Sequence, residues 1–283
     1  MVMQVSTLNN GCLMPQVGFG VGQIWNNTTT QQIVLAALQA GYRSIDTAAS
    51  YHNETGVGQA LATSGLPREE LFITSKLWIQ DTTYAAAKTA FQTSLDKLQL
   101  DYLDLYLIHQ PYNDTFGAWR ALEELYAAGK VRAIGVSNFT AGQLTNLALY
   151  STITPMIDQI QFNPLHQQRE LQTVAREFQV QLEAWAPLAH GTQTLAAEPL
   201  LQKLAVKYHK TVAQIILRWE LQQGLIIIPK TTHTTRLREN ITLFDFTLTG
   251  AECYALKQLD QQPVSFFNEA ALIKRLKNLR LHD

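Results

Sequence analysis

Cysteine and charged side chains are both scarce in this chain. Its 283 residues include only two cysteines, Cys12 and Cys253, which excludes a disulfide framework and leaves no Cys-x-x-Cys or Cys/His spacing for a metal. Charged residues make up 16% of the sequence, against a usual share of about 25%, so neutral polar side chains must cover much of the surface. Hydrophobic residues make up 46%, enough for a large core, which excludes disorder as the main state.

Neither sign of charge is in excess. The chain has 22 Lys and Arg against 23 Asp and Glu, for a net charge of -1, and this balance gives no overall attraction to nucleic acid or to an anionic membrane. No apolar run approaches the roughly 18 residues that span a bilayer. The first residues also lack the basic and then apolar pattern of a signal peptide. We therefore expect a cytoplasmic protein without a nucleic-acid or membrane partner.

Short apolar runs alternate with helical patterns along the whole chain. Each run has the length of a strand and is apolar on both faces, as in a buried parallel sheet; the runs are 42–46, 71–76, 102–108, 131–136, 156–161, 181–185 and 225–228. Apolar stripes at helical spacing lie between them, and Gly41 and Gly129 are plausible helix ends. About eight strand–helix units predict an α/β fold, a (β/α)8 TIM barrel that forms one domain over residues 1–283.

A doubly wound sheet fits the same alternation, but its phosphate-binding glycine pattern is missing. Gly18 and Gly20 begin a G-x-G, yet the third glycine falls at Gly22 rather than three residues further on. Before them, Asn10-Gly11 followed by an apolar run predicts an N-terminal β-hairpin. Such a hairpin would close the bottom of a barrel.

Polar side chains end the first three runs. Asp46 ends the first run with Tyr51 just beyond it, Lys76 ends the second, and His109 follows the third. In a barrel the carboxyl ends of the strands form one mouth, where catalytic residues lie. A phenol titrates near pH 10, and a nearby ammonium held by a carboxylate favours the phenolate. Together with an imidazole that orients a carbonyl, this set would protonate an oxygen as charge develops on it.

The motifs around these residues resemble those of the aldo-keto reductase family. GYRSIDTAASYHNETGVGQAL, from Gly41 to Leu61, is similar to the family signature, and ITSKLW and LYLIHQP are similar to its second and third motifs. GVSNF resembles its nicotinamide-binding segment, and IIIPKTTHTTRLRENITLFDF resembles its adenine- and phosphate-binding segment. The likeness extends from the hairpin to the last helix. It also extends to bacterial-type members that reduce small aldehydes, α-dicarbonyls and keto sugars.

The resemblance implies a catalytic tetrad and a nicotinamide site. The tetrad would be Asp46, Tyr51, Lys76 and His109, with Tyr51 as the acid that protonates a carbonyl oxygen after hydride transfer from the reduced cofactor. Contacts to the nicotinamide and the pyrophosphate are implied at six further positions: Ser137, Asn138 and Gln159 at the carboxamide, Trp185 stacked on the ring, and Pro187 and Leu188 in the loop over the pyrophosphate. An indole replaces the family's usual tyrosine at Trp185 and can stack as well.

The same resemblance implies the adenosine end of the site. Lys230, Thr231 and Arg236 match the group around the 2′-phosphate, and Glu239 and Asn240 match the adenine contacts. Two cations beside a dianionic phosphate favour NADPH over NADH. The family implies a monomer, and the proposed chemistry needs no metal.

Two departures from the family pattern fall at the substrate mouth. Gly22 and Gln110 stand where many members have tryptophan, which predicts a more open and more polar pocket for small aldehydes, α-dicarbonyls, keto esters or keto sugars. We expect Trp25 and Trp78 to restore part of the wall and to contact substrate together with Gln110. The segment Ser265–Asn268 would lay an aromatic ring over the mouth.

Two other functions fit parts of the pattern. A barrel lyase would use Lys76 as a Schiff-base nucleophile, although a neighbouring Asp46 opposes the lowered lysine pKa that this requires. A cofactor-binding regulatory or structural protein would keep the nucleotide contacts but has no need of Tyr51. Taken singly, each residue also has a purely structural explanation, such as a helix cap for Asp46 or a satisfied core imidazole for His109.

Overall fold

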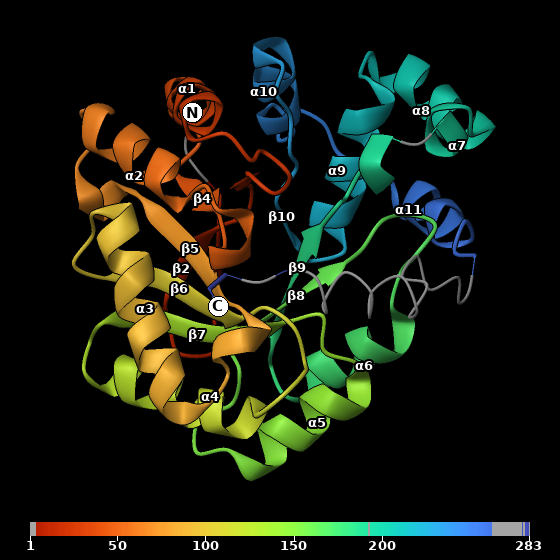
Figure 1. Ribbon diagram of the computed structural model, residues 1–283. Helices are drawn as coiled ribbons and strands as arrows, with labels where there is room; N and C mark the ends of the chain where they lie inside the picture. Colours follow the sequence, from red (N-terminus) through yellow and green to blue (C-terminus); the bar gives the residue numbers. More distant parts are fainter. Residues whose placement is uncertain (1–3, 192, 262–278, 280, 283) are drawn as a thin grey trace.

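Eight parallel strands follow one another in chain order across one sheet (Figure 1). This computed structural model describes residues 4–191, 193–261, 279 and 281–282. The strands are β3 (Phe19–Gly20), β4 (Ser44–Asp46), β5 (Phe72–Leu77), β6 (Leu103–Ile108), β7 (Val131–Ser137), β8 (Ile157–Gln161), β9 (Gln181–Trp185) and β10 (Ile226–Ile227). Every neighbouring pair is parallel, as βαβ connections require.

The first and last strands of the sheet meet and close it into a barrel. Val17 forms a parallel bridge with Ile227, and the Gly18 N–H donates to the Ile227 carbonyl at 2.8 Å while the Ile227 N–H donates to the Gln16 carbonyl at 3.0 Å. The predicted (β/α)8 barrel is therefore confirmed, and the doubly wound sheet is excluded because its strand order reverses.

Strand β3 is the one barrel strand that the apolar runs did not reveal. It is two residues long, and the G-x-G pattern places Gly18 directly before it and Gly20 as its second residue. A Cβ at Gly18 would lie 3.0 Å from Ile228 Cγ2 and from Ser44 Oγ, and one at Gly20 would lie 3.1 Å from the Ile228 carbonyl oxygen. These glycines therefore permit the close approach of strands that closes the barrel.

Helices surround the strands on the outside (Figure 1). Most begin at a side-chain cap, with full capping boxes at Thr140, Thr211 and Thr249, and Gly41 and Gly129 follow their helices with positive φ as predicted. The helices are α1 (Asn27–Gln39), α2 (Glu54–Thr63), α3 (Tyr84–Leu98), α4 (Thr115–Ala127), α5 (Ala141–Tyr150), α6 (Arg169–Glu177), α7 (Gln193–Ala196), α8 (Pro199–Tyr208), α9 (Val212–Gln222), α10 (Thr234–Ile241) and α11 (Gly250–Lys257).

The core lies inside the barrel and between the barrel and its helices. All residues of β5 and β6 are buried, so both faces of these strands are covered. Between the layers, Phe91 of α3 packs edge-on against Tyr106 of β6 with ring centroids 5.0 Å apart. Phe162 stacks on Trp219 of α9 at 5.7 Å. Burial of side chains this large contributes roughly 1.5–3 kcal/mol each and holds the strand ends in fixed positions.

The predicted N-terminal hairpin covers the bottom of the barrel. It pairs β1 (Val5–Thr7) with β2 (Leu13–Pro15), and Gly11 takes a positive φ of 84° in its turn. The Asn9 side-chain amide donates to the Pro155 carbonyl at 3.1 Å, next to the start of β8. Met14 is fully buried. The hairpin leaves the opposite end of the barrel, where the carboxyl ends of the strands lie, available for a functional site.

Candidate active site

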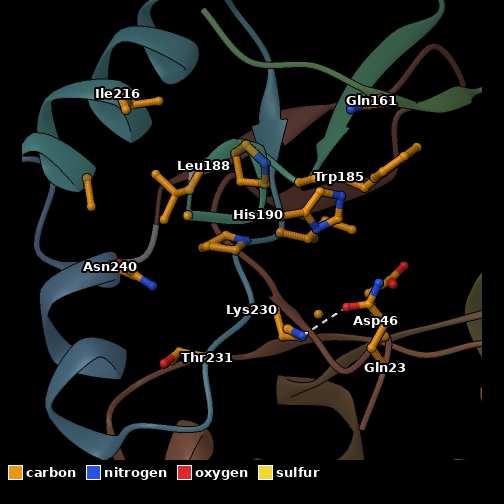
Figure 2. A pocket seen from close by; sticks show the side chains of 18 of the residues that line it. Gln23, Asp46, Gln161, Trp185, Leu188, His190, Ile216, Lys230, Thr231 and Asn240 are labelled. Atoms are coloured by element: carbon orange, nitrogen blue, oxygen red, sulfur yellow. Dashed lines mark hydrogen bonds between the residues drawn. The ribbon is translucent and has the colours of Figure 1, made fainter. Parts of the chain in front are cut away.

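A cavity of about 820 Å³ lies at the carboxyl ends of the barrel strands. Figure 2 shows it from close by, with Asp46 and Trp185 on one side and Thr231 and Asn240 on the other. The sequence predicts fourteen other site residues, and twelve of them line this cavity. Those that line the cavity are Tyr51, Trp78, His109, Gln110, Ser137, Asn138, Gln159, Pro187, Leu188, Lys230, Arg236 and Glu239, while Lys76 and Trp25 do not.

Lys76 lies behind Asp46 and forms a buried ion pair with it. Its Nζ donates to Asp46 Oδ1 at 2.6 Å and to the Thr47 carbonyl at 2.9 Å, and neither side chain is more than 3% exposed. Burial by itself lowers the pKa of Lys76, but the adjacent Asp46 outweighs it and the pKa is raised. The ammonium therefore stays charged, with its Nζ 5.2 Å from the centre of the Tyr51 ring.

Tyr51 owes its position to a short 3-10 turn after β4. The turn, Ala49–Tyr51, ends where His52 adopts a left-handed conformation with φ 56°. The buried Asn53 fixes it from below, since its Nδ2 donates to the Val21 and Ile24 carbonyls at 3.0 and 2.8 Å. Asn53 thus ties the Tyr51 turn to the loop after β3. Sequence reasoning gave Asn53 no role, although it belongs to the quoted signature.

His109 is held among rings and a hydroxyl. Its ring centroid lies 5.6 Å from that of Tyr51 and 5.3 Å from that of Trp78, both edge-on. Ser50 Oγ lies 3.2 Å from His109 Nδ1. The imidazole and the phenol therefore occupy one corner of the cavity, and the buried Lys76 ammonium lies behind that corner.

The next strand ends are linked by a chain of hydrogen bonds. Asn138, with a positive φ of 63°, donates from Nδ2 to the His109 carbonyl at 3.1 Å and to Ser137 Oγ at 3.0 Å. Ser137 Oγ in turn donates to the backbone carbonyl of Gln159 at 2.8 Å. Trp185 Nε1 donates to Asn138 Oδ1 at 2.9 Å, which fixes the indole ring. Four strand ends are thereby held in one polar array.

Gln159 connects the array to two buried carboxyl groups. Its Nε2 donates to Asp46 Oδ2 at 2.8 Å and to Glu183 Oε2 at 2.7 Å. Sequence reasoning missed Glu183, which is fully buried inside the barrel. Burial, followed by the charge of Asp46, raises its pKa to about 8, against the opposing effects of the Gln159 hydrogen bond and Lys76.

The opposite end of the cavity is exposed and positively charged. Lys230 Nζ donates to Gln23 Oε1 at 3.3 Å, across the cavity from β10 to the loop after β3 (Figure 2). Arg236 on α10 is exposed and forms no ion pair within the described part of the chain. Thr231 and Asn240 are buried beside it, and Glu239 accepts a hydrogen bond from Thr211 Oγ1.

The predicted aromatic wall is present only in part. Trp78 lines the cavity, and its indole N–H donates to the Leu279 carbonyl at 3.3 Å. Trp25 is 53% exposed and lies outside the lining, because the chain turns at Gln23, with φ 65°, and buries Ile24 instead. The segment Ser265–Asn268 falls outside the described residues. Gln161, which sequence reasoning missed, lines the cavity beside Trp185.

The described residues contain neither a metal-binding cluster nor a membrane-spanning helix. No group of three or more His, Cys, Asp and Glu side chains is arranged to hold a metal ion in that part of the chain. None of its helices is long and apolar enough to cross a membrane.

The chain is similar to known reductases over most of its length. The model of the aldo/keto reductase family matches residues 16–261. A glyoxal reductase of Bacillus subtilis is 51% identical over 90% of this chain and 92% of its own length. A methylglyoxal reductase of Escherichia coli is 44% identical over 91% of this chain and 94% of its own.

A solved structure shows the same fold at lower identity. The aldo-keto reductase of Bombyx mori in complex with NADP superposes with a TM-score of 0.90 at 37% identity, over 95% of this chain and 97% of that one. The family match over residues 16–261 and the similarity to these relatives lead to one assignment. This chain belongs to the aldo/keto reductase family.

Proposed function

We propose that the chain reduces small aldehydes and ketones to alcohols with NADPH. The observation that carries the proposal is one cavity with two unlike ends. Tyr51, His109 and the buried Lys76–Asp46 pair stand at one end, and the exposed cations Lys230 and Arg236 stand at the other. The first end fits proton donation to a carbonyl oxygen, and the second fits a nucleotide phosphate.

The cavity side chains fit NADPH along its length. Ser137, Asn138 and Gln159 present polar groups for the carboxamide, and the fixed indole of Trp185 offers a face for the nicotinamide ring. Pro187 and Leu188 line the cavity where the pyrophosphate would lie. At the far end the residues of the adenosine site are those named from the sequence: Lys230, Thr231, Arg236, Glu239 and Asn240. When bound, NADPH supplies the hydride.

In this mechanism Tyr51 gives its proton to the substrate oxygen. The buried ammonium of Lys76, held charged by Asp46, stabilises the phenolate that remains. His109, fixed by Ser50 and Trp78, orients the carbonyl oxygen toward the phenol. Because these groups are in place before substrate arrives, little reorganisation is needed in the transition state.

The pocket favours small substrates that carry a second polar group. A Cβ at Gly22 would lie 3.4 Å from Tyr51 Cζ, so a larger residue there would fill the space above the phenol. Gln110 and Gln161 are only 9% and 5% exposed and line the cavity, and their amides have no hydrogen-bond partner among the described residues. Amide groups that line the cavity and have no partner in the described part of the chain can bond a second polar group of a ligand. We therefore favour α-dicarbonyls and keto sugars over aromatic aldehydes.

A Schiff-base lyase is disfavoured by the geometry of Lys76. A nucleophilic lysine must lose its proton, whereas Lys76 is fully buried, bonded to Asp46 and has a raised pKa. A protein that only binds cofactor has no use for the tetrad. The cytoplasmic location, the monomeric state and the single domain over 1–283 stay predictions.

The test is consumption of NADPH with a panel of carbonyls: methylglyoxal, a keto sugar, a keto ester and a benzaldehyde. We expect turnover, with methylglyoxal and the keto sugar ahead of benzaldehyde in kcat/KM. Cofactor binding, measured by fluorescence quenching, without turnover of any carbonyl would contradict the proposal and favour the binding protein.

A further inference from the structure

We propose that Glu183 is a positioning residue for the cofactor, because it fixes the Gln159 amide with its oxygen toward the nicotinamide carboxamide. The inference rests on the proposed function, since it requires the nicotinamide to bind beside Gln159. Glu183 itself lies below the cavity in the barrel interior and is absent from the cavity lining. It therefore acts through Gln159.

The hydrogen bonds of Gln159 leave only one group for a ligand. A side-chain amide has two N–H donors on one nitrogen, and both are used, at 2.8 Å to Asp46 and 2.7 Å to Glu183. Gln159 lines the cavity, so its side-chain oxygen, Oε1, is the atom left to contact a bound molecule. That oxygen is an acceptor and suits the N–H donors of a carboxamide.

Two carboxyl groups hold the amide more firmly than one does. The reversed amide would place its oxygen against oxygens of both Asp46 and Glu183, which come from opposite sides on β4 and β9. With Asp46 alone, one buried N–H of Gln159 would lack an acceptor, at a cost of about 1–3 kcal/mol. The amide would then gain by rotating that N–H toward the cavity, where it would oppose the carboxamide donors.

Glu183 keeps this role in either protonation state. The groups that face it are Asp46, Lys76 and Gln159, from β4, β5 and β8, and burial with the Asp46 charge raises its pKa to about 8. Its Oε1 has no hydrogen-bond partner, so a proton on Oε1 leaves Oε2 free to accept from Gln159. Burying a carboxyl group with one unbonded oxygen costs free energy of folding. This cost suggests that Glu183 has a functional role beyond packing.

The test compares two reduced cofactors in variants of Glu183. The first is NADPH, and the second is its 3-acetylpyridine analogue, in which a methyl ketone replaces the carboxamide and removes its N–H donors. Glu183→Met removes the acceptor at nearly constant length, and Glu183→Gln keeps an acceptor without the charge. Glu220→Met is the matched control, because Glu220 is also fully buried with both oxygens unbonded but lies on α9.

The measured quantity is the ratio of kcat/KM for the two cofactors. Intrinsic differences in hydride donation cancel when this ratio is compared between variants. We expect Glu183→Met to lower the preference for NADPH about tenfold, the worth of one hydrogen bond to a well-placed donor. Glu183→Gln and Glu220→Met should keep the wild-type ratio. An unchanged ratio in Glu183→Met overturns the inference.

A second measurement covers the case in which Glu183→Met does not fold. A crystal structure of the wild-type NADP⁺ complex should keep Gln159 Nε2 within hydrogen-bond distance of both carboxyl groups, and an amide that has left Glu183 overturns the inference. Failure of the proposed function has a different signature, which is wild-type protein that neither binds nor oxidises NADPH. The inference then falls with that function.

Discussion

The two ends of the cavity differ in how their charged side chains are buried and paired. At the end that holds Tyr51 and His109, called the tetrad end below, Lys76 and Asp46 are buried and bonded to each other. Gln159 donates hydrogen bonds to both Asp46 and Glu183. At the end proposed for the adenosine phosphate, called the adenosine end below, Lys230 and Arg236 are exposed, and Arg236 has no ion pair in the described ranges. The charges of Lys76 and Asp46 are therefore paired before a ligand binds, whereas the exposed cations at the other end are available to pair with a ligand.

Because of this difference, we expect one end of the cavity to determine the reaction rate and the other to determine the affinity for cofactor. Charges in a dry interior interact strongly and need no rearrangement during reaction. Exposed cations are screened by salt, and each adds a modest amount to binding. We therefore expect changes at the tetrad end to affect rate and folding, and changes at the adenosine end to affect cofactor affinity.

The largest effect should follow from Tyr51→Phe. The variant removes the proton donor and keeps the ring, so kcat should fall by about 10²–10⁴-fold, the usual contribution of a general acid. The Kd for NADPH should stay within about twofold, because the phenol contributes a proton rather than cofactor binding. Steady-state kinetics and fluorescence titration measure the two quantities. Near wild-type turnover in this variant would remove Tyr51 from the mechanism.

Asp46→Leu should damage folding as well as rate. It leaves the Lys76 ammonium buried without its partner, which typically costs about 3–5 kcal/mol in the free energy of unfolding. Urea denaturation measures the loss. The double variant Asp46→Leu/Lys76→Met is the control, because it removes both charges and should regain most of the stability without regaining activity. Equal stability of the single and double variants would show that the ion pair is not the cause.

Stability should fall as pH rises from 6 to 8. Burial raises the pKa of Asp158, Glu183 and Glu220, so the folded state holds protons that the unfolded state releases, and this stabilisation is lost as pH increases. For Glu183, with a pKa of about 8, the slope is at most about 1.4 kcal/mol per pH unit. Urea denaturation at several pH values should show a shallower slope for Glu183→Gln. An identical slope would mean that Glu183 does not titrate in this range.

Arg236→Ala should weaken NADPH binding about tenfold, as expected for loss of one charge-assisted hydrogen bond. NADH lacks the 2′-phosphate, so its Kd should change by less than about twofold. Arg238→Ala is a matched control, because Arg238 is exposed on the same helix but does not line the cavity. Fluorescence titration with both cofactors tests this prediction. Equal weakening of the two would place Arg236 away from the phosphate.

The smallest effect should come from Gly22→Ala. The new Cβ would lie 3.4 Å from Tyr51 Cζ, which is ordinary contact, so it narrows the mouth without displacing the phenol. We expect KM for a keto sugar to rise about twofold to fivefold, with KM for NADPH unchanged. This is less than the roughly tenfold effect of one methylene in a closed hydrophobic pocket, because the added methyl group makes only ordinary contact with the phenol. A larger fall in kcat than in affinity would indicate displacement of Tyr51.

Residues at strand ends were predictable from the sequence, because parallel strands bring their carboxyl ends to one mouth. Asp46, Lys76 and His109 each follow an apolar run, and motif resemblance supplied the adenosine contacts. Strand β3 was not predictable from apolar periodicity, since only two residues form it and its glycines serve barrel closure.

Glu183 and Trp25 show why other parts could not be predicted. In the sequence Gln181–Trp185, Glu183 is one charge in a short strand, and only the register with β8 places it opposite Gln159. Trp25 has the chemistry of a wall residue, but the backbone turn at Gln23 directs it outward. Both outcomes depend on strand register and local backbone conformation, which composition and spacing do not specify.

The most direct test of the account is a single turnover with NADPH that carries deuterium at the transferable C4 position and with methylglyoxal as substrate. We expect deuterium on the carbinol carbon of the product, transferred at a rate that Tyr51→Phe reduces. Bound cofactor that transfers no deuterium to any carbonyl would contradict it.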